Sequence, residues 1–165
     1  MTDLVFKELD KQVIIDKFDC GDKDINNFLN NLALLNQERK LSRSYVFCLK
    51  DSNEIVAFLT LSASQLNTGD SRIFGIDKVA IVLLGRLGVD NNYRDKNLGI
   101  ALIKIALEKS LEASKIIACR LFLVEITLNM KSYYLEKVNM GFEWFRDRKN
   151  NSILFIDLKR YEENL

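Results

Sequence analysis

A polar connector between two apolar segments carries the residue types that bind phosphate groups. It runs from Asn91 to Gly99, contains the cations Arg94 and Lys96, and leads into an apolar segment that begins at Leu98. The first backbone N–H groups of a helix have no partner inside the helix, so a helix start attracts anions. Together with the two cations, these N–H groups predict a site for a phosphate-bearing ligand.

The connector joins an expected strand to an expected helix. Apolar residues run through 78–89, and helix-forming residues run from Asn97 to about Ala113. Gly85 and Gly88 interrupt the strand. A glycine inside a strand marks a bulge or the close approach of another backbone or a ligand, or it simply falls on a curved strand. Both interpretations stay open at this stage.

Hydrophobic spacing places the other elements in order along the chain. An edge strand is expected near 5–9, followed by a helix that is capped by Asp22 and points apolar residues inward: Ile25, Phe28, Leu29, Leu32 and Leu35. An antiparallel hairpin (45–49 and 55–61) and a mobile loop (62–77) come next. The final elements are a strand at 120–125, a helix at 131–137 closed by Gly141, and strands at 142–145 and 152–158.

Composition limits the class of protein. The 165 residues are 48% hydrophobic and 28% charged, which predicts one globular α/β domain spanning residues 1–165. The net charge of +1 argues against a wholly basic surface. The N-terminus does not resemble a signal peptide, and no apolar run reaches membrane-spanning length, so a cytoplasmic protein without membrane association is expected.

The absence of histidine excludes several chemistries. Ser-His-Asp and Cys-His catalysis are impossible, and the three widely spaced cysteines give no familiar zinc spacing, so no metal site is expected. A general acid or base must be another side chain or a bound water. Two adjacent tyrosines, Tyr133 and Tyr134, lie on the expected 131–137 helix, where such residues are more often packing aromatics. Glu125 at a strand end, or a water, is a candidate base.

The element order and the connector resemble the GNAT N-acetyltransferases over nearly the whole chain. That family has the signature Arg/Gln-x-x-Gly-x-Gly/Ala, and the matching residues are Arg94-Asp95-Lys96-Asn97-Leu98-Gly99. Asn97 stands where the first glycine is expected. Asparagine tolerates a left-handed backbone better than other non-glycine residues, so the loop conformation is expected to survive.

Three separated segments resemble one branch of that family, the toxins that acetylate aminoacyl-tRNA. They are Phe18-Asp19-Cys20-Gly21, the run Leu83 to Asp90, and Ser132-Tyr133-Tyr134. The branch has similar segments in the same order. The segment between Tyr134 and the Gly141-Phe142 pair is about three residues longer than is usual there.

The resemblance implies a single-domain GNAT fold, a mixed and mostly antiparallel sheet flanked by helices, with splayed central strands. It implies acetyl-CoA as cosubstrate, with an N–H near Val89 polarising the thioester carbonyl. It also implies Tyr134 as the catalytic general acid, with Tyr133 as the fallback. The residues expected to bind acetyl-CoA are Leu87, Gly88, Val89, Arg94, Asp95, Lys96, Asn97, Leu98, Gly99 and Ile100.

The resemblance further implies transfer of an acetyl group to a primary amine, the α-amine of aminoacyl-tRNA in the toxin branch. Such a toxin is expected to form a homodimer and to be neutralised by a small DNA-binding antitoxin. Two alternatives stay open: an ordinary GNAT enzyme acting on a small amine or a protein N-terminus, and a catalytically weak acyl-CoA-binding regulatory domain. Basic residues that either bind an RNA backbone or are merely solvated are Arg39, Lys40, Arg43, Arg72, Lys78 and Arg86.

Overall fold

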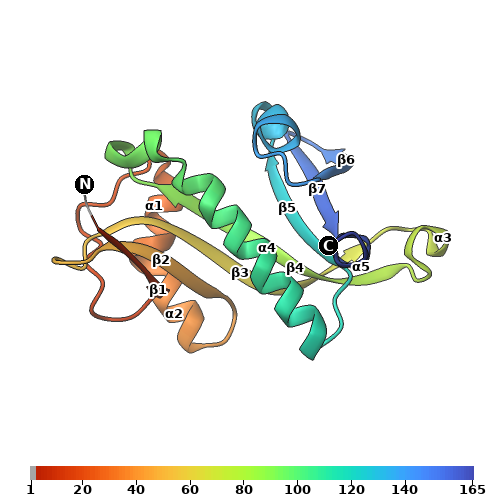
Figure 1. The fold of residues 1–165 in the computed structure, drawn as a ribbon, viewed down its shortest axis with the longest axis horizontal. Helices are drawn as coiled ribbons and strands as arrows, with labels where there is room; N and C mark the ends of the chain where they lie inside the picture. Colours follow the sequence, from red (N-terminus) through yellow and green to blue (C-terminus); the bar gives the residue numbers. More distant parts are fainter. Residues whose placement is uncertain (1–2) are drawn as a thin grey trace. The chain divides into compact units, whose positions relative to one another are not determined.

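The computed structural model describes residues 3–165, and its strands form one mixed sheet in the order β1-β2-β3-β4-β5-β7-β6 (Figure 1). Most neighbouring strands are antiparallel, as the family resemblance implied, while β4 and β5 are parallel. The described residues group into two compact units, each described by itself below. The single domain over residues 1–165 stays a prediction. Among the described residues, no helix is both long enough and apolar enough to span a membrane.

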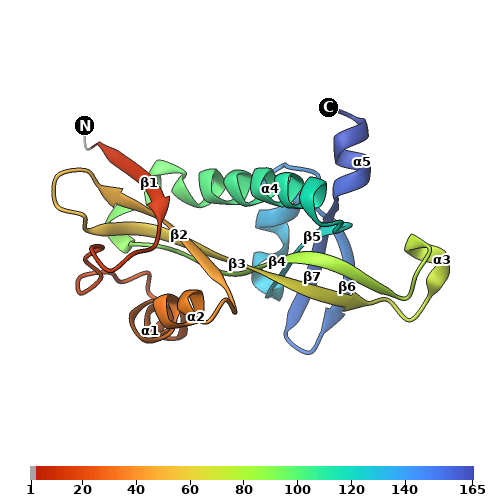
Figure 2. The ribbon, with the colours of Figure 1, turned by 90° about the horizontal axis from the view of Figure 1, so that it is seen from below.

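The first unit comprises residues up to Ser62 together with Gly85–Ile103. Its strands β1 (Leu4–Glu8), β2 (Arg43–Leu49) and the first part of β3 (Ile55–Asn67) are antiparallel, and the expected hairpin of β2 and β3 is confirmed. The helices α1 (Lys23–Asn31) and α2 (Ala33–Glu38) lie on one face of these strands (Figure 2). The core between them contains Phe18, Phe28, Leu29, Val46 and Phe58.

The helix α1 begins where the sequence predicts, but it ends earlier. Asp22 accepts hydrogen bonds from the N–H groups of Asp24 and Ile25, which makes it the N-cap. Leu32 leaves the helical conformation (φ −124°, ψ −31°), so the chain breaks into two short helices. The break rotates the inward face, and Leu32 and Leu35 are 41% and 38% exposed. Their predicted burial is therefore wrong.

The second unit comprises Ala63–Leu84 and Lys104–Leu165. It contains most of α4 (Leu98–Ile116) and the first part of β4 (Lys78–Val89), up to Leu84. Residues 81–84 of β4 pair in parallel with 121–124 of β5 (Leu121–Thr127), and β7 (Asn151–Asp157) joins β5 to β6 (Glu143–Arg148). Its core contains Leu66, Val79, Ile81, Leu121, Leu123 and Ile153. The predicted separation of β4 from β5 beyond these pairs stays a prediction.

Two segments of this unit differ from the sequence predictions. The expected loop over 62–77 is wrong, because β3 continues to Asn67 and Ser71–Phe74 form the short helix α3. The residues of this segment are mainly polar, so the sequence did not indicate that the strand continues and that Leu66 is buried. The chain also ends in a helix, α5 (Leu158–Glu163), which was not expected. Asp157 caps it by accepting from the Lys159 and Arg160 N–H groups, so the last strand stops before Leu158.

Candidate active site

Asp90 organises the connector that follows β4 in the first unit. Its buried carboxylate accepts from the N–H of Asn92 at 2.9 Å and from the N–H of Asp19 at 3.1 Å. The Asp90 N–H in turn donates to the Val56 carbonyl at 2.8 Å, which ties the connector to β3. A short 3₁₀ helix, η1 (Asn91–Lys96), follows directly. The connector is thus a fixed turn.

Asn97 closes η1 and begins α4. Its backbone is left-handed (φ 57°, ψ 26°), as the sequence predicted for the residue that replaces the family's glycine. The Asn97 carbonyl accepts the N–H of Ala101 at 3.1 Å, the first bond of the helix. The N–H groups of Leu98, Gly99 and Ile100 therefore belong to the first turn, where a helix has no internal acceptor for them.

Arg94 braces the connector, a role that the sequence did not reveal. Its guanidinium Nη2 donates to the carbonyl oxygen of Cys20. A Cβ added at Gly21 would come within 3.0 Å of that nitrogen, and Gly21 also has φ +85°, so this position suits glycine. Hydrogen bonds from the Gly21 N–H and Asn26, with the Arg94 charge, lower the pKa of the Asp19 carboxyl. The Phe18–Gly21 segment thus holds Arg94.

The two glycines of β4 have different surroundings. A Cβ at Gly88 would come within 3.0 Å of Ile25 and of Phe58, so side-chain packing excludes a larger residue there without rearrangement. At Gly85 the nearest atom is the carbonyl oxygen of Thr60 at 3.9 Å, an ordinary contact. Close approach explains Gly88, and nothing in the structure requires glycine at position 85.

The predicted acetyl-CoA residues from Leu87 to Ile100 all lie in the first unit. Tyr134 lies in the second unit, on a helical segment after β5. That segment comprises the 3₁₀ turn η2 (Leu128–Met130) and a wider π-helical turn, η3 (Tyr133–Lys137), in which the Val138 N–H donates to the Tyr133 carbonyl at 2.9 Å. The left-handed Asn139 follows it, so the prediction that Gly141 closes this helix is wrong.

Aromatic packing fixes Tyr134. Its side chain is only 6% exposed, and its ring meets Phe142 edge-on with centroids 5.5 Å apart. Phe142 in turn contacts the fully buried Phe122 of β5 at 5.8 Å. Tyr133 lies against Tyr134 in the same edge-on arrangement at 5.7 Å. Tyr134 therefore points into the core of this unit.

Burial also sets the protonation state of this tyrosine. Desolvation, with a smaller contribution from Tyr133, raises the pKa of Tyr134 to about 12. Burial likewise raises the pKa of Tyr133. Within residues 3–165 the Tyr134 hydroxyl makes no hydrogen bond. Its oxygen is not fully buried, since it is not among the completely buried polar atoms without a partner. At neutral pH it is a protonated phenol that remains available to donate.

Comparisons with known proteins point to one group. No family model matches the chain. A curated protein of Mycobacterium tuberculosis (strain ATCC 25618 / H37Rv), named tRNA-acetylating toxin, is 28% identical over 114 residues, 67% of this chain and 68% of its own length. The solved structure of AtaTR bound with AcCoA is 26% identical with a TM-score of 0.79, and covers 98% of both chains. AtaT complexed with acetyl-methionyl-tRNAfMet has a TM-score of 0.84 at 23% identity, covering 98% of this chain and 99% of AtaT.

The chain has the fold of the GNAT toxins. This confirms the predicted fold class and the resemblance on which it was based. Asn97, which stands where the family signature has a glycine, has a left-handed backbone in this fold. No group of three or more His, Cys, Asp or Glu side chains within residues 3–165 is arranged to hold a metal ion.

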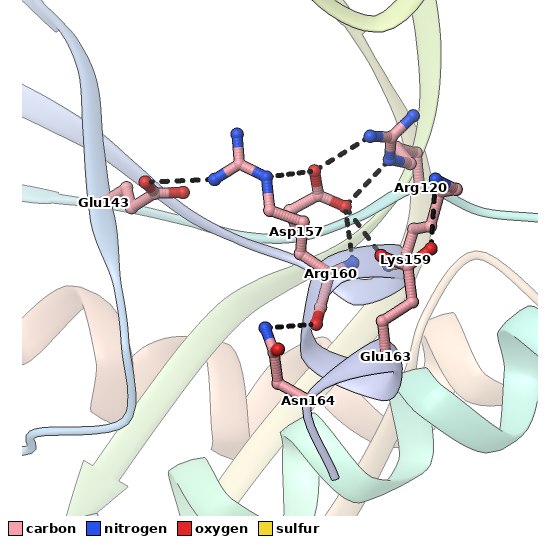
Figure 3. A network of polar contacts seen from close by, with 7 residues as sticks. All are labelled: Arg120, Glu143, Asp157, Lys159, Arg160, Glu163 and Asn164. Carbon is pink, nitrogen blue, oxygen red and sulfur yellow. Dashed lines mark hydrogen bonds and ion pairs between the residues drawn. The ribbon is translucent and has the colours of Figure 1, made fainter.

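A polar network in the second unit of this GNAT-toxin fold ties β5 to the C-terminal helix (Figure 3). Asp157 accepts two hydrogen bonds from the Arg120 guanidinium at 2.8 and 2.9 Å, and it pairs with Arg160 at 3.7 Å. Burial raises the pKa of Asp157, but the Arg120 and Arg160 hydrogen bonds outweigh it and lower the pKa overall. Arg160 also pairs with Glu143 at 3.6 Å. The network is structural.

Glu125 and Cys119 have surroundings that do not mark either residue as catalytic. Glu125, the candidate base, is exposed and accepts a long hydrogen bond of 3.4 Å from Asn151. Cys119 is half-buried, and burial raises the pKa of its thiol, as expected for a packing cysteine. Neither contact distinguishes a catalytic group from a structural one.

Proposed function

We propose that this chain is an acetyl-CoA-dependent N-acetyltransferase that acetylates the α-amine of aminoacyl-tRNA and so inhibits translation. The observation that carries the proposal is the similarity, over two thirds of each chain, to a protein named tRNA-acetylating toxin. The AcCoA-bound and acetyl-methionyl-tRNAfMet-bound relatives have the same fold over nearly the whole chain and support the same chemistry.

The first unit offers a suitable place for the pyrophosphate of acetyl-CoA. The left-handed Asn97 turns the chain so that the N–H groups of Leu98, Gly99 and Ile100 begin α4 together. Lys96 is exposed beside them and adds charge. Arg94 has one nitrogen engaged by Cys20, so we assign it a double role, as brace of the turn and as a cation near the phosphates.

The pantetheine arm would lie along the end of β4. The backbone of Leu87, Gly88 and Val89 would pair with its amides as an added strand would. Asp95 lies within η1 and contributes to the turn that shapes the phosphate site. Acetyl-CoA supplies a thioester whose carbonyl carbon accepts the amine, and an N–H near Val89 would polarise that carbonyl.

Tyr134 is the proposed general acid. Negative charge builds on the departing sulfur of coenzyme A, and a phenol with a pKa of about 12 is fully protonated at neutral pH, so it can share its proton with that sulfur. The packed ring holds the hydroxyl in one place. Transfer to a thiolate of ordinary pKa, about 8.5, is uphill, so the phenol acts mainly by donating a hydrogen bond as negative charge builds on the sulfur.

The partners follow from the same relatives. Solved structures include AtaT bound to the C-terminus of the antitoxin AtaR and a KacTA-DNA complex. We propose a small DNA-binding antitoxin, a homodimer and a cytoplasmic location for this chain as well. An ordinary GNAT enzyme acting on small amines or protein N-termini, and a weakly catalytic acyl-CoA-binding domain, are the alternatives to be tested.

The deciding experiment measures acetyl transfer from labelled acetyl-CoA to bulk aminoacyl-tRNA. Wild type should label the amino acid on tRNA, and Tyr134→Phe should lose about 100-fold or more of the rate while binding acetyl-CoA normally. Tyr161→Phe on α5 is the matched control, and Tyr133→Phe tests the fallback acid. Acetyl-CoA binding without labelled tRNA would refute the tRNA assignment, and labelled small amines or peptides would then identify the ordinary enzyme.

A further inference from the structure

The only tryptophan of the chain, Trp144, lies on β6 at the edge of the sheet and is 50% exposed. Single exposed apolar residues are common and by themselves require no explanation. Trp144 differs because several polar contacts fix the orientation of its ring. A fixed and exposed indole is a surface on which another flat group can stack.

Asp147, Lys131 and Ser152 hold the indole in place, and we call these three residues the polar clamp. The indole Nε1 donates to Asp147 Oδ1 at 2.9 Å, and Lys131 Nζ lies 4.9 Å from the ring centroid. The same Asp147 oxygen accepts the Ser152 hydroxyl at 2.8 Å and pairs with Lys131 at 3.9 Å. Hydrogen bonds from Trp144 and Ser152 lower the pKa of Asp147, so the Asp147 carboxylate stays negatively charged at neutral pH.

A β-bulge makes this clamp possible. Trp144 pairs with Leu154 and Asp147 pairs with Ser152, with an extra residue on β6 between positions 144 and 146. Side chains directly opposite in a ladder share a face, and residues two apart on β7 share that face too. Trp144 and Asp147 therefore lie on one face. In a regular strand, residues three apart would face opposite sides.

Trp144 and Tyr134 lie on the same face of the sheet in this unit. Ile156, two residues after Leu154 on β7, pairs with Phe122 of β5. The Phe122 ring contacts Phe142, and Phe142 contacts Tyr134. Figure 1 shows the helical segment that carries Tyr134 at the end of β5, beside β7 and β6. Lys131 belongs to that segment, so the clamp and the proposed general acid share one element.

The segment that carries Tyr134 supplies cations that favour an anionic partner. Lys131 lies over the Trp144 ring and pairs with Asp147, and Lys137 lies over the Tyr133 ring with its nitrogen 5.9 Å from the centroid. Arg146 and Arg148 lie on the opposite face, because they pair with Ile153 and Asn151 of β7, and Arg146 donates there to the Asn67 carbonyl. Elsewhere, Arg43 and Arg72 are paired with Glu8 and Asp70 at 2.9 Å.

We propose that Trp144 is the platform on which an unpaired base of the acceptor RNA stacks, with Lys131 and Lys137 of the Tyr134 segment available to its phosphates. This inference rests on the proposed function. Aromatic rings flanked by cations are how proteins hold single-stranded nucleic acid, because every unpaired base offers a flat face. The amine of a charged tRNA is carried on an unpaired 3′ end, so a base platform on the Tyr134 face would guide that end.

Because Trp144 is the sole tryptophan, its fluorescence reports this site alone. We expect bulk deacylated tRNA to quench the emission. The same tRNA with its unpaired 3′ nucleotides removed, and a blunt RNA duplex, should leave the emission nearly unchanged. Equal quenching by all three probes would contradict stacking of an unpaired base.

Variants test whether the stacking matters for binding. With fluorescein-labelled tRNA, Trp144→Ala should weaken binding about tenfold, and Trp144→Tyr should retain most of the affinity because a ring remains. Acetyl-CoA affinity should not change in either variant. Ile116→Ala, at the 83% exposed end of α4, is the matched control for loss of an exposed apolar side chain.

The possible failures can be told apart. If Trp144→Ala binds and acetylates aminoacyl-tRNA like wild type, the platform is wrong and the proposed function stands. If wild type neither binds nor acetylates RNA, both fall. If Trp144 emission shifts with protein concentration in the absence of RNA, and Trp144→Ala abolishes self-association, the surface is an interface between copies of this chain and the platform is again wrong.

Discussion

Two segments carry the proposed chemistry, and different forces hold them in place. The connector from Asp90 to Asn97 is held mainly by backbone and carboxylate hydrogen bonds, within the connector itself and to Asp19, Cys20 and Val56. The turn from Leu128 to Lys137 is held by rings supplied by β5 and by the segment before β6. The first depends on polar contacts, and the second depends on the packing of aromatic rings.

This difference predicts how each segment fails. Loss of a packing ring should remove support from the whole Tyr134 turn, because no capping side chain closes that turn within the described residues. Loss of one hydrogen bond in the connector should be partly offset by the bonds that remain. The predictions below test that order, beginning with the largest effect.

Phe142→Ala should destabilise the protein most. Phe142 is buried between Phe122 and Tyr134, so the truncation leaves a cavity that costs about 3 to 5 kcal/mol. Denaturant unfolding measures the loss, and Leu128→Ala, an exposed residue of the same segment, is the control. A cost below about 1 kcal/mol would show that the turn does not depend on the Phe142 ring, and would contradict the difference drawn between the two segments.

Asp90→Ala should have the next largest effect. It removes an acceptor of two backbone N–H groups at a buried site, which we expect to cost about 2 to 3 kcal/mol. The exposed Asp95→Ala is the control within the same connector and should change stability by less than about 0.5 kcal/mol. Equal effects of the two substitutions would contradict the role given to Asp90.

The features that depend on one residue type at one position could be predicted from the sequence. The Asp22 cap, the start of α4 and the left-handed Asn97 follow from the preferences of single residues, and all three are present. The Asp157 cap of α5 had the same kind of signal, an aspartate before a run of helix formers, and it was missed because Leu158 was assigned to the strand.

Contacts between distant residues gave no signal in the sequence. The bond from Arg94 to the Cys20 carbonyl joins residues 74 positions apart, and the bulge that lets Trp144 reach Asp147 depends on the register with β7. The break at Leu32 and the wide turn at Tyr133 also depart from regular helical spacing, and neither is marked by a glycine or proline in the sequence. Family resemblance, and not residue spacing, singled out Tyr134.

Alkaline pH should weaken the aromatic segment selectively. The folded pKa of Tyr134 is about 12, above its usual value near 10, so the unfolded chain loses this proton first as the pH rises. The stability linked to this group is complete below pH 10 and falls between about pH 10 and 12, by about 2 kcal/mol. Unfolding of wild type and Tyr134→Phe should therefore differ in slope there. Parallel curves would contradict a buried neutral phenol.

Asn97 gives the smallest effect and the sharpest contrast between the two segments, because Asn139 at the end of the Tyr134 turn is also left-handed (φ 57° and 51°). Alanine is strained in that conformation, so Asn97→Ala and Asn139→Ala should each cost about 1 kcal/mol, whereas glycine at either position should be nearly neutral. Isothermal titration with acetyl-CoA separates them. Only Asn97→Ala should weaken binding, because only Asn97 shapes the first turn of α4. Equal loss of acetyl-CoA affinity in both variants would show that Asn97 has no special part in the phosphate site, and the connector would then have a purely structural role.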